Sequence, residues 1–218
     1  MPLLKGRVGL PGLAPKPELP PEPQVNPWAP GNLAKGLGQV KTWLDYAVRA
    51  ITLSRAAYQA IAKDAYMTAP ALMIALLSQI LQSLNNEGSL DIVNILLRYG
   101  VWFLAVLFLY LAAFLLRGKA DYTSTLRLAG FAQSAHLLEI FGFVPVIGPA
   151  VRFLALLLAF FGVWIGVSTA HELRGWRTLL LPVIFIATTV ITVVFLAGVI
   201  EGTTLAIDSI LQDFGLVP

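Results

Sequence analysis

Residues 92–116 read IVNILLRYGVWFLAVLFLYLAAFLL and contain one charged side chain, Arg98. About 20 predominantly apolar residues in helical conformation are enough to cross the ~30 Å hydrocarbon core of a bilayer. A run of this length and composition is therefore predicted to be a transmembrane helix.

Four further apolar runs flank this segment, and each is close to the length that a membrane crossing needs. They lie at residues 66–84, 122–143, 150–170 and 179–200. The run 122–143 is interrupted by Gln133, His136 and Glu139, so we expect that helix to be buried in the bundle, away from lipid. The predicted fold class is all-α, a polytopic membrane helical bundle with five transmembrane helices.

The composition agrees with a membrane protein. Of the 218 residues, 57% are hydrophobic and 12% are charged, whereas soluble proteins are about 25% charged. The formal charge is +3, and the basic residues are scattered singly, which argues against a nucleic-acid partner. The chain has no cysteine, which excludes disulfides, thiolate metal sites and thiol nucleophiles. No metal site is predicted.

The region before the first span divides into two segments. Residues 1–38 contain nine prolines, each of which fixes φ and restricts the residue before it, so an extended Pro-rich N-terminal arm is predicted. Residues 39–64 place aliphatic and aromatic side chains on one helical face and Lys and Arg on the other. This pattern predicts an amphipathic interfacial helix, with packing on a partner as the alternative. Residues 65–218 are assigned to the five-span domain.

The arm is predicted to anchor the chain to other integral membrane subunits. A polyproline II segment rises ~3.1 Å per residue and can reach across a neighbouring subunit. Trp28 is the strongest single candidate, because buried aromatic side chains dominate interface energy. The predicted contact residues are Leu10, Leu13, Leu19, Val25 and Trp28.

Loop charge predicts the orientation of the chain. Basic residues precede the first span and follow the second and fourth, whereas the segment after the first span and the C-terminal tail carry Asp and Glu. The positive-inside rule then predicts a multi-pass protein of the cell (inner or cytoplasmic) membrane. Its N-terminus is expected in the cytoplasm and its C-terminus outside. The lipid bilayer is expected to surround its spans.

Four polar residues in or beside the third run form a candidate buried cluster: Gln133, His136, Glu139 and Arg152. His136 and Glu139 are three residues apart and share a helical face, so they can hydrogen-bond or share a proton. Arg152, across the short turn, is the predicted charge partner of Glu139. Ionisable groups at this depth are functional candidates. Three interpretations stay open: a polar clasp between helices, a proton or ion path, and ligation of a haem or chlorophyll-type pigment by His136.

The second histidine, His171, stands at the cytoplasmic end of the fourth run, at a different depth from His136. The two cannot share one haem iron or metal ion, and His171 is interpreted as an interfacial cap. Segments that face water contain no Gly-rich phosphate loop, Ser–His–Asp order, HExxH motif or paired carboxylates. We therefore expect no catalytic residue and no enzyme activity.

Three short segments resemble a known family. They are 121–133 (DYTSTLRLAGFAQ), 144–148 (VPVIG) and 171–177 (HELRGWR). Through them the chain, from about residue 58 to 200, resembles a prokaryotic-type member of the Yip family. The resemblance implies a five-span membrane domain with a cytoplasmic N-terminal region and no catalytic residue. Eukaryotic members of that family are named for contacts with Ypt/Rab GTPases in vesicle traffic.

These observations favour a non-catalytic accessory or scaffold subunit of a larger membrane protein complex. The first alternative is a stand-alone Yip-like membrane-organising protein. A small transporter or channel that uses His136 and Glu139 is the second, and a pigment- or haem-binding subunit is the third. No other cofactor is expected.

Overall fold

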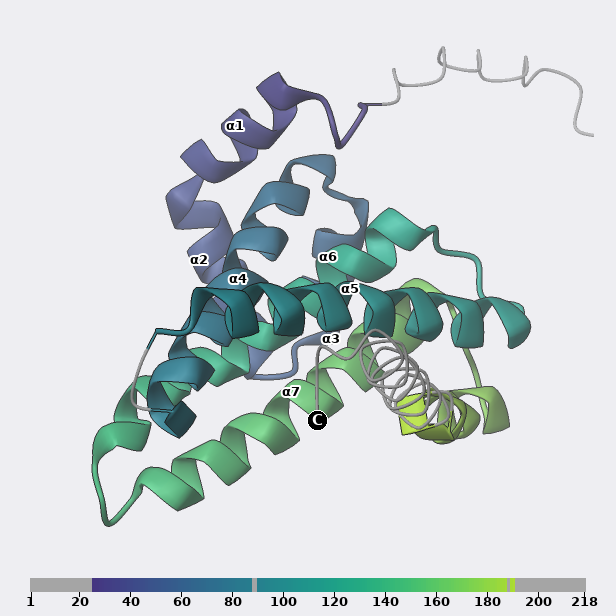
Figure 1. Ribbon diagram of the computed structural model, residues 1–218. Helices are drawn as coiled ribbons and strands as arrows, with labels where there is room; N and C mark the ends of the chain where they lie inside the picture. The colour runs from purple at the N-terminus through teal and green to yellow at the C-terminus, as the bar shows by residue number, and fades with distance from the viewer. Residues whose placement is uncertain (1–24, 88–89, 188, 191–218) are drawn as a thin grey trace, which may run out of the picture.

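The computed structural model describes residues 25–87, 90–187 and 189–190. Throughout these ranges the regular structure is helical and no strand occurs (Figure 1), which confirms the predicted all-α class. In chain order the elements are α1 (Pro30–Gly38), α2 (Val40–Ile51), α3 (Arg55–Lys63), η1 (Ala65–Met67), α4 (Thr68–Glu87), α5 (Ile92–Leu115), α6 (Tyr122–Ala132), η2 (Gln133–Phe143) and α7 (Gly148–Ala170). A further apolar helix follows at Trp176–Ala187.

Among the described residues, three helices are long and apolar enough to cross a membrane: α4 together with η1, α5, and α7. The prediction of five spans is confirmed for these three only. The predicted run 122–143 changes helix type at Gln133 and divides into α6 and η2. The predicted run 179–200 begins in the helix Trp176–Ala187, and its residues 188 and 191–200 lie outside the described part of the chain.

The joint between α6 and η2 is continuous, since Gln133 keeps right-handed helical angles of φ −63° and ψ −14°. The element η2 is a 3₁₀ helix of 11 residues, much longer than the usual three or four. At ~1.5 Å per α-helical residue and ~2.0 Å per 3₁₀ residue, the two elements together extend about 38 Å. A 3₁₀ helix has three residues per turn, so His136, Glu139 and Gly142 lie in one line, and all three are buried.

The core lies where α3 crosses α7 and α6. Tyr58 of α3 is fully buried, together with Ile61 and Phe131. Its ring lies on Gly162 and Gly166 of α7, where any added Cβ would meet the ring or its hydroxyl group. The Tyr58 hydroxyl group also donates a hydrogen bond of 3.1 Å to the carbonyl of Ala50 in α2. One side chain therefore ties α2, α3 and α7 together.

The N-terminal region differs from the prediction at two places. The arm predicted as extended over 1–38 becomes helical at Pro30, because proline is well tolerated in the first turn of a helix, and forms α1. The single interfacial helix predicted over 39–64 is two helices, α2 and α3. Leu53 between them takes a positive φ of 58°, and the Ser54 side chain accepts a hydrogen bond from the backbone of Ala57 and caps α3.

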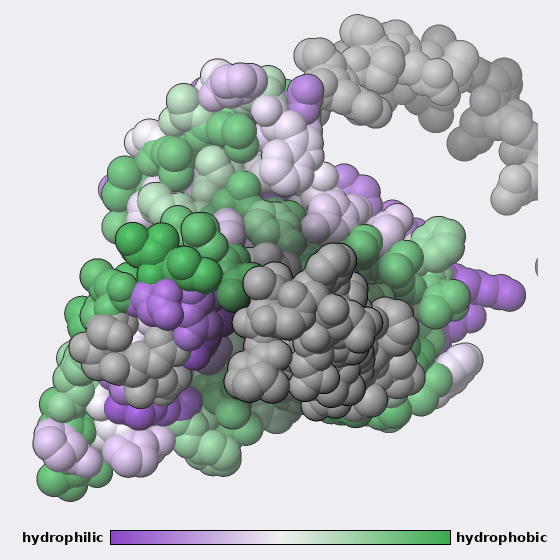
Figure 2. All heavy atoms as spheres, in the orientation of Figure 1, coloured by the Kyte–Doolittle hydropathy of each residue, from purple (hydrophilic) through white to green (hydrophobic). Residues whose placement is uncertain are grey.

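The outer faces of the candidate spans are apolar. In an apolar stretch of 18 residues within each candidate span, 22% of α5 and 28% of α7 are buried, against 56% of α4 with η1. Leucine, valine, isoleucine and phenylalanine make up most of the large exposed side chains of α5 and α7, and Figure 2 shows such apolar surface over much of the visible outside of the bundle. Because a water-facing helix would place charged residues there, these faces suit lipid or other apolar helices.

Candidate functional site

The candidate site begins with a buried histidine–carboxylate pair on η2. The Nδ1 atom of His136 lies 2.5 Å from Oε1 of Glu139, and both side chains are buried. The pair is close because residues three apart stack directly in a 3₁₀ helix. A carboxylate accepts hydrogen bonds, so Nδ1–H of His136 is the donor and Glu139 fixes which ring nitrogen carries the proton.

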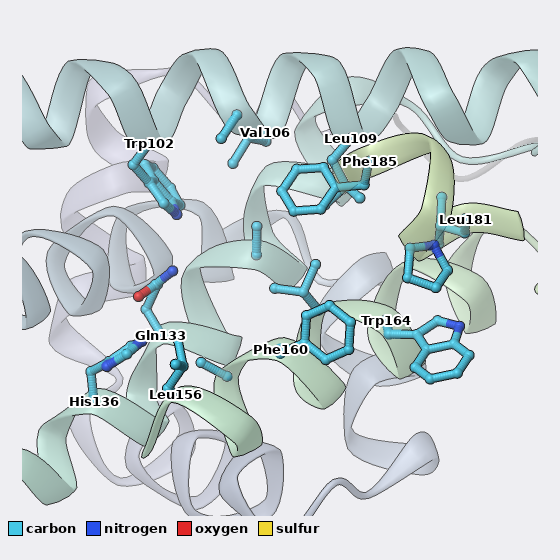
Figure 3. A pocket seen from close by; sticks show the side chains of 15 residues that line it. Trp102, Val106, Leu109, Gln133, His136, Leu156, Phe160, Trp164, Leu181 and Phe185 are labelled. Atoms are coloured by element: carbon cyan, nitrogen blue, oxygen red, sulfur yellow. The ribbon is translucent and has the colours of Figure 1, made fainter. Parts of the chain in front are cut away.

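The remaining nitrogen of His136, Nε2, has no hydrogen-bond partner within the described part of the chain. With the proton held at Nδ1, Nε2 presents a lone pair and acts as an acceptor. Figure 3 shows the His136 ring at one end of a cavity. The sequence identified His136 and Glu139 as a pair but not the cavity that His136 borders.

Gln133 stands one 3₁₀ turn before His136 and borders the same cavity. Its Oε1 atom lies 3.4 Å from the hydroxyl oxygen of Ser78 in α4, whose single proton goes to the Ala75 carbonyl at 2.7 Å. Figure 3 shows the amide nitrogen of Gln133 on the side of Trp102 and the cavity. Across the described residues the N–H₂ group has no acceptor.

Trp102 of α5 completes the polar end of the cavity. Its side chain is buried, and its indole nitrogen is turned toward Gln133 in Figure 3. No acceptor for this N–H group occurs within residues 25–87, 90–187 and 189–190. The sequence analysis missed Trp102, although a tryptophan in the middle of a span is a usable signal, because tryptophan otherwise prefers the membrane interface.

The cavity has a volume of about 220 Å³ and lies between α5, η2, α7 and the helix Trp176–Ala187. Beyond its polar end the lining is aliphatic and aromatic, including Leu109, Val163 and Phe185. Leu156 of α7 lines the cavity near Gln133 and His136 (Figure 3), and it is also 57% exposed on the outside of the bundle. The site is an apolar pocket with three polar groups at one end.

Arg152 does not pair with Glu139, so that prediction was wrong. Its Nη2 donates a 3.2 Å hydrogen bond to the carbonyl of Gly142, at the end of η2. Asn85 of α4 donates a 2.9 Å hydrogen bond to the backbone carbonyl of Glu139. The 3₁₀ geometry directs the Glu139 carboxylate along the helix toward His136, which leaves Arg152 to hold the backbone of η2 instead of its side chain.

His171 lies at the C-cap of α7 but is buried, with 1% of its surface exposed, instead of facing the interface as predicted. Its Nε2 is 2.9 Å from the hydroxyl oxygen of Thr125, whose own proton goes to the carbonyl of Asp121 at 3.0 Å. Nε2–H is therefore the donor. Burial lowers the pKa of His171 to about 4, against a smaller opposing effect of the Asp121 charge, so His171 is neutral at pH 7.

Of the predicted contact residues of the arm, the structure describes Val25 and Trp28. Leu10, Leu13 and Leu19 lie outside the described residues. Val25 is exposed, and Trp28 is 44% exposed while its indole N–H donates a 3.3 Å hydrogen bond to Thr123 at the start of α6. Trp28 thus lies on its own domain with part of its ring available, and its contact with a partner stays a prediction.

Among the described residues, no group of three or more His, Asp or Glu side chains is placed to hold a metal ion. Haem or pigment ligation by His136 stays a prediction. A carboxylate at Nδ1 is also the arrangement that orients many metal-binding histidines, so the pair is compatible with such a ligand without requiring one.

The family model of the Yip1 domain matches residues 48–197, which is more than half of the chain. This chain belongs to the Yip1 domain family. The match confirms the resemblance to the Yip family. No curated protein and no solved structure matches the chain.

The Yip1 domain contains the whole candidate site. Trp102, Gln133, His136 and Glu139 all fall inside the matched range, as does Tyr58 in the core. Trp28 and helix α1 precede it. The cavity is therefore part of the Yip1 domain itself, whereas the arm is an addition in front of it.

Proposed function

We propose that this Yip1 domain protein is a non-catalytic accessory or scaffold subunit that binds other integral membrane proteins. The observation that carries the proposal is the small buried share of α5 and α7, which is 22% and 28% of their apolar stretches. Two long apolar helices that bury so little within their own chain offer continuous faces for lipid and for neighbouring helices. Such faces are what a subunit of a membrane assembly needs.

A second apolar surface supports the proposal. The helix α2 buries Ala47 and Ala50 in the core and exposes Val40, Leu44 and Val48 on another side. These three exposed residues are spaced by four and form one stripe, outside the candidate spans. An exposed apolar stripe of this kind marks contact with a bilayer surface or with a partner.

We also propose the predicted orientation, with five spans in the cell membrane, the N-terminus in the cytoplasm and the C-terminus outside. The α6–η2 rod supports a fourth crossing, because about 38 Å of helix is enough for the ~30 Å hydrocarbon core. The helix Trp176–Ala187 is the described beginning of the fifth.

A small transporter or channel is the second candidate, favoured by the buried His136–Glu139 pair. Against it, the neighbouring polar groups bond mostly inside the bundle. Asn85 donates to the backbone of η2 and Ser134 donates to the carbonyl of Phe131. These contacts favour the clasp between helices over a path for ions.

Native mass spectrometry after gentle detergent extraction tests the proposal. We expect the chain to co-migrate with other integral membrane proteins in fixed ratio. A variant lacking residues 2–30 removes all five predicted contact residues, Trp28 included, and it is expected to lose those partners while the membrane domain keeps its fold. A homo-oligomer without other subunits would support the stand-alone Yip-like organiser instead, and full retention of partners by the shortened chain would refute the role of the arm.

A further inference from the structure

The cavity between α5, η2 and α7 has three polar atoms at one end that find no partner in the described part of the chain. They are the indole N–H of Trp102, the amide N–H₂ of Gln133 and Nε2 of His136. Trp102 and His136 are each more than nine-tenths buried. None of the three atoms is among the fully enclosed unpaired atoms of the described residues, so each is accessible from the cavity and can bind a polar group of a ligand.

The three atoms define the head group that fits between them. Trp102 and Gln133 offer donors, while Nε2 of His136 offers an acceptor because Glu139 holds the proton at Nδ1. A hydroxyl group satisfies both demands, since its oxygen accepts from the donors and its proton goes to Nε2. A carbonyl group can only accept, and an anionic head is disfavoured by the carboxylate of Glu139 directly behind His136.

The rest of the cavity defines the body of the ligand. Its volume of about 220 Å³ exceeds the ~150 Å³ of an apolar cavity that binds benzene. Leu109, Val163 and Phe185 make its wall apolar. Trp102 and Gln133 lie near the middles of α5 and of the α6–η2 rod, so a ligand enters sideways from the hydrocarbon.

We propose that this cavity binds a neutral, mainly apolar molecule with one hydroxyl group, such as a fatty or isoprenoid alcohol. The hydroxyl group donates to Nε2 of His136 and accepts from Gln133 and Trp102. The hydrocarbon part extends from this polar end along the apolar wall of Leu109, Val163 and Phe185. This proposal does not rest on the accessory or scaffold role, because it is argued from polar groups inside the Yip1 domain.

Photo-crosslinking of the purified full chain tests the proposal. The probe is a 12-carbon primary alcohol that carries a diazirine and an alkyne, in vesicles of phosphatidylcholine and phosphatidylglycerol. We expect labels on peptides of α5, η2 and α7, and competition by unlabelled 1-decanol. The methyl ether of decanol keeps the chain and the acceptor but has no proton for His136, and it is expected to compete about 10-fold less well, because one hydrogen bond is lost.

Variants sharpen the test. Gln133→Leu and Trp102→Phe each remove one donor and keep most of the side-chain volume, and each is expected to weaken labelling about 5- to 10-fold. Gln82→Leu is the matched control, since Gln82 of α4 does not border this cavity. Equal competition by the alcohol and the ether in the unmodified chain would show a cavity filled by any apolar chain and would overturn the proposal. Labelling confined to other helices would overturn it as well.

Discussion

Glu139 is the acceptor on which the buried His136 depends. Glu139→Gln keeps an acceptor oxygen at the same place and is expected to change the free energy of unfolding by less than about 1 kcal/mol. Glu139→Leu leaves the N–H group of His136 buried without a partner and is expected to cost about 1–3 kcal/mol. Thermal unfolding in detergent measures both variants.

A double variant separates the effect of an unpaired His136 N–H group from the effect of replacing Glu139 by an apolar side chain. His136→Phe with Glu139→Leu removes both polar partners, and such a replacement can be nearly neutral, so it is expected to be more stable than Glu139→Leu alone. Equal destabilisation by Gln and Leu at position 139 would contradict the structural role of the hydrogen bond. A transport activity lost in Glu139→Gln at unchanged stability would favour the transporter.

His171 makes the stability depend on pH. Its pKa is about 4 in the folded chain, against 6.5 for an ordinary histidine. Between these values the unfolded chain binds a proton that the folded chain excludes, so the free energy of unfolding rises with pH. The contribution, about 3 kcal/mol, is complete above pH 6.5 and is lost as the pH falls toward 4.

Thermal unfolding in detergent at a series of pH values measures this effect. His171→Gln removes the titrating group, and its unfolding temperature is expected to fall less than that of the unmodified chain between pH 6.5 and 4. Asp121 is the charged group that acts on His171, so Asp121→Asn is expected to steepen the loss. An identical pH profile for His171→Gln and the unmodified chain would contradict the buried neutral histidine.

At the scale of the elements, the contact of α3 with α7 depends on two glycines. A Cβ at Gly166 would lie 2.9 Å from the Tyr58 ring, which is too close for a buried aromatic ring to accommodate. Gly166→Ala is therefore expected to destabilise the fold by about 1–3 kcal/mol. Denaturant or thermal unfolding provides the measurement.

Gly100 offers the matched control, since it lies inside α5 with open space around its Cα atom. Gly100→Ala gains helix propensity and is expected to stabilise by up to about 1 kcal/mol. If both alanine variants stabilised the chain equally, helix propensity alone would account for the glycines and the close contact with Tyr58 would be disproved.

At the scale of the whole molecule, the five-span proposal fixes the side of each loop. A reporter fused after Lys119 is expected to be active in the cytoplasm, because Arg117 and Lys119 follow the second span. A reporter fused after Pro218 is expected to be active outside. A cytoplasmic reporter after Pro218 would leave an even number of crossings and end the five-span proposal.

The sequence by itself determined the helical class, the family and three candidate spans. These follow from local properties. In a bilayer, the backbone N–H and C=O groups of a long apolar run such as 92–116 find hydrogen-bond partners by forming one helix. The spacing of His136 and Glu139 also predicted their contact, because residues three apart are neighbours in any helix.

Only the tertiary structure decided the change to a 3₁₀ helix at Gln133, the partner of Arg152 and the burial of His171. It also brought Trp102 to Gln133 and His136 from a helix more than 30 positions earlier in the chain. Such contacts join segments distant in sequence, and they depend on how closely the helices approach. Gly130, Gly162 and Gly166 permit that approach because they lack a Cβ atom. The spacing of residues along one helix does not show which other segment of the chain packs against these glycines.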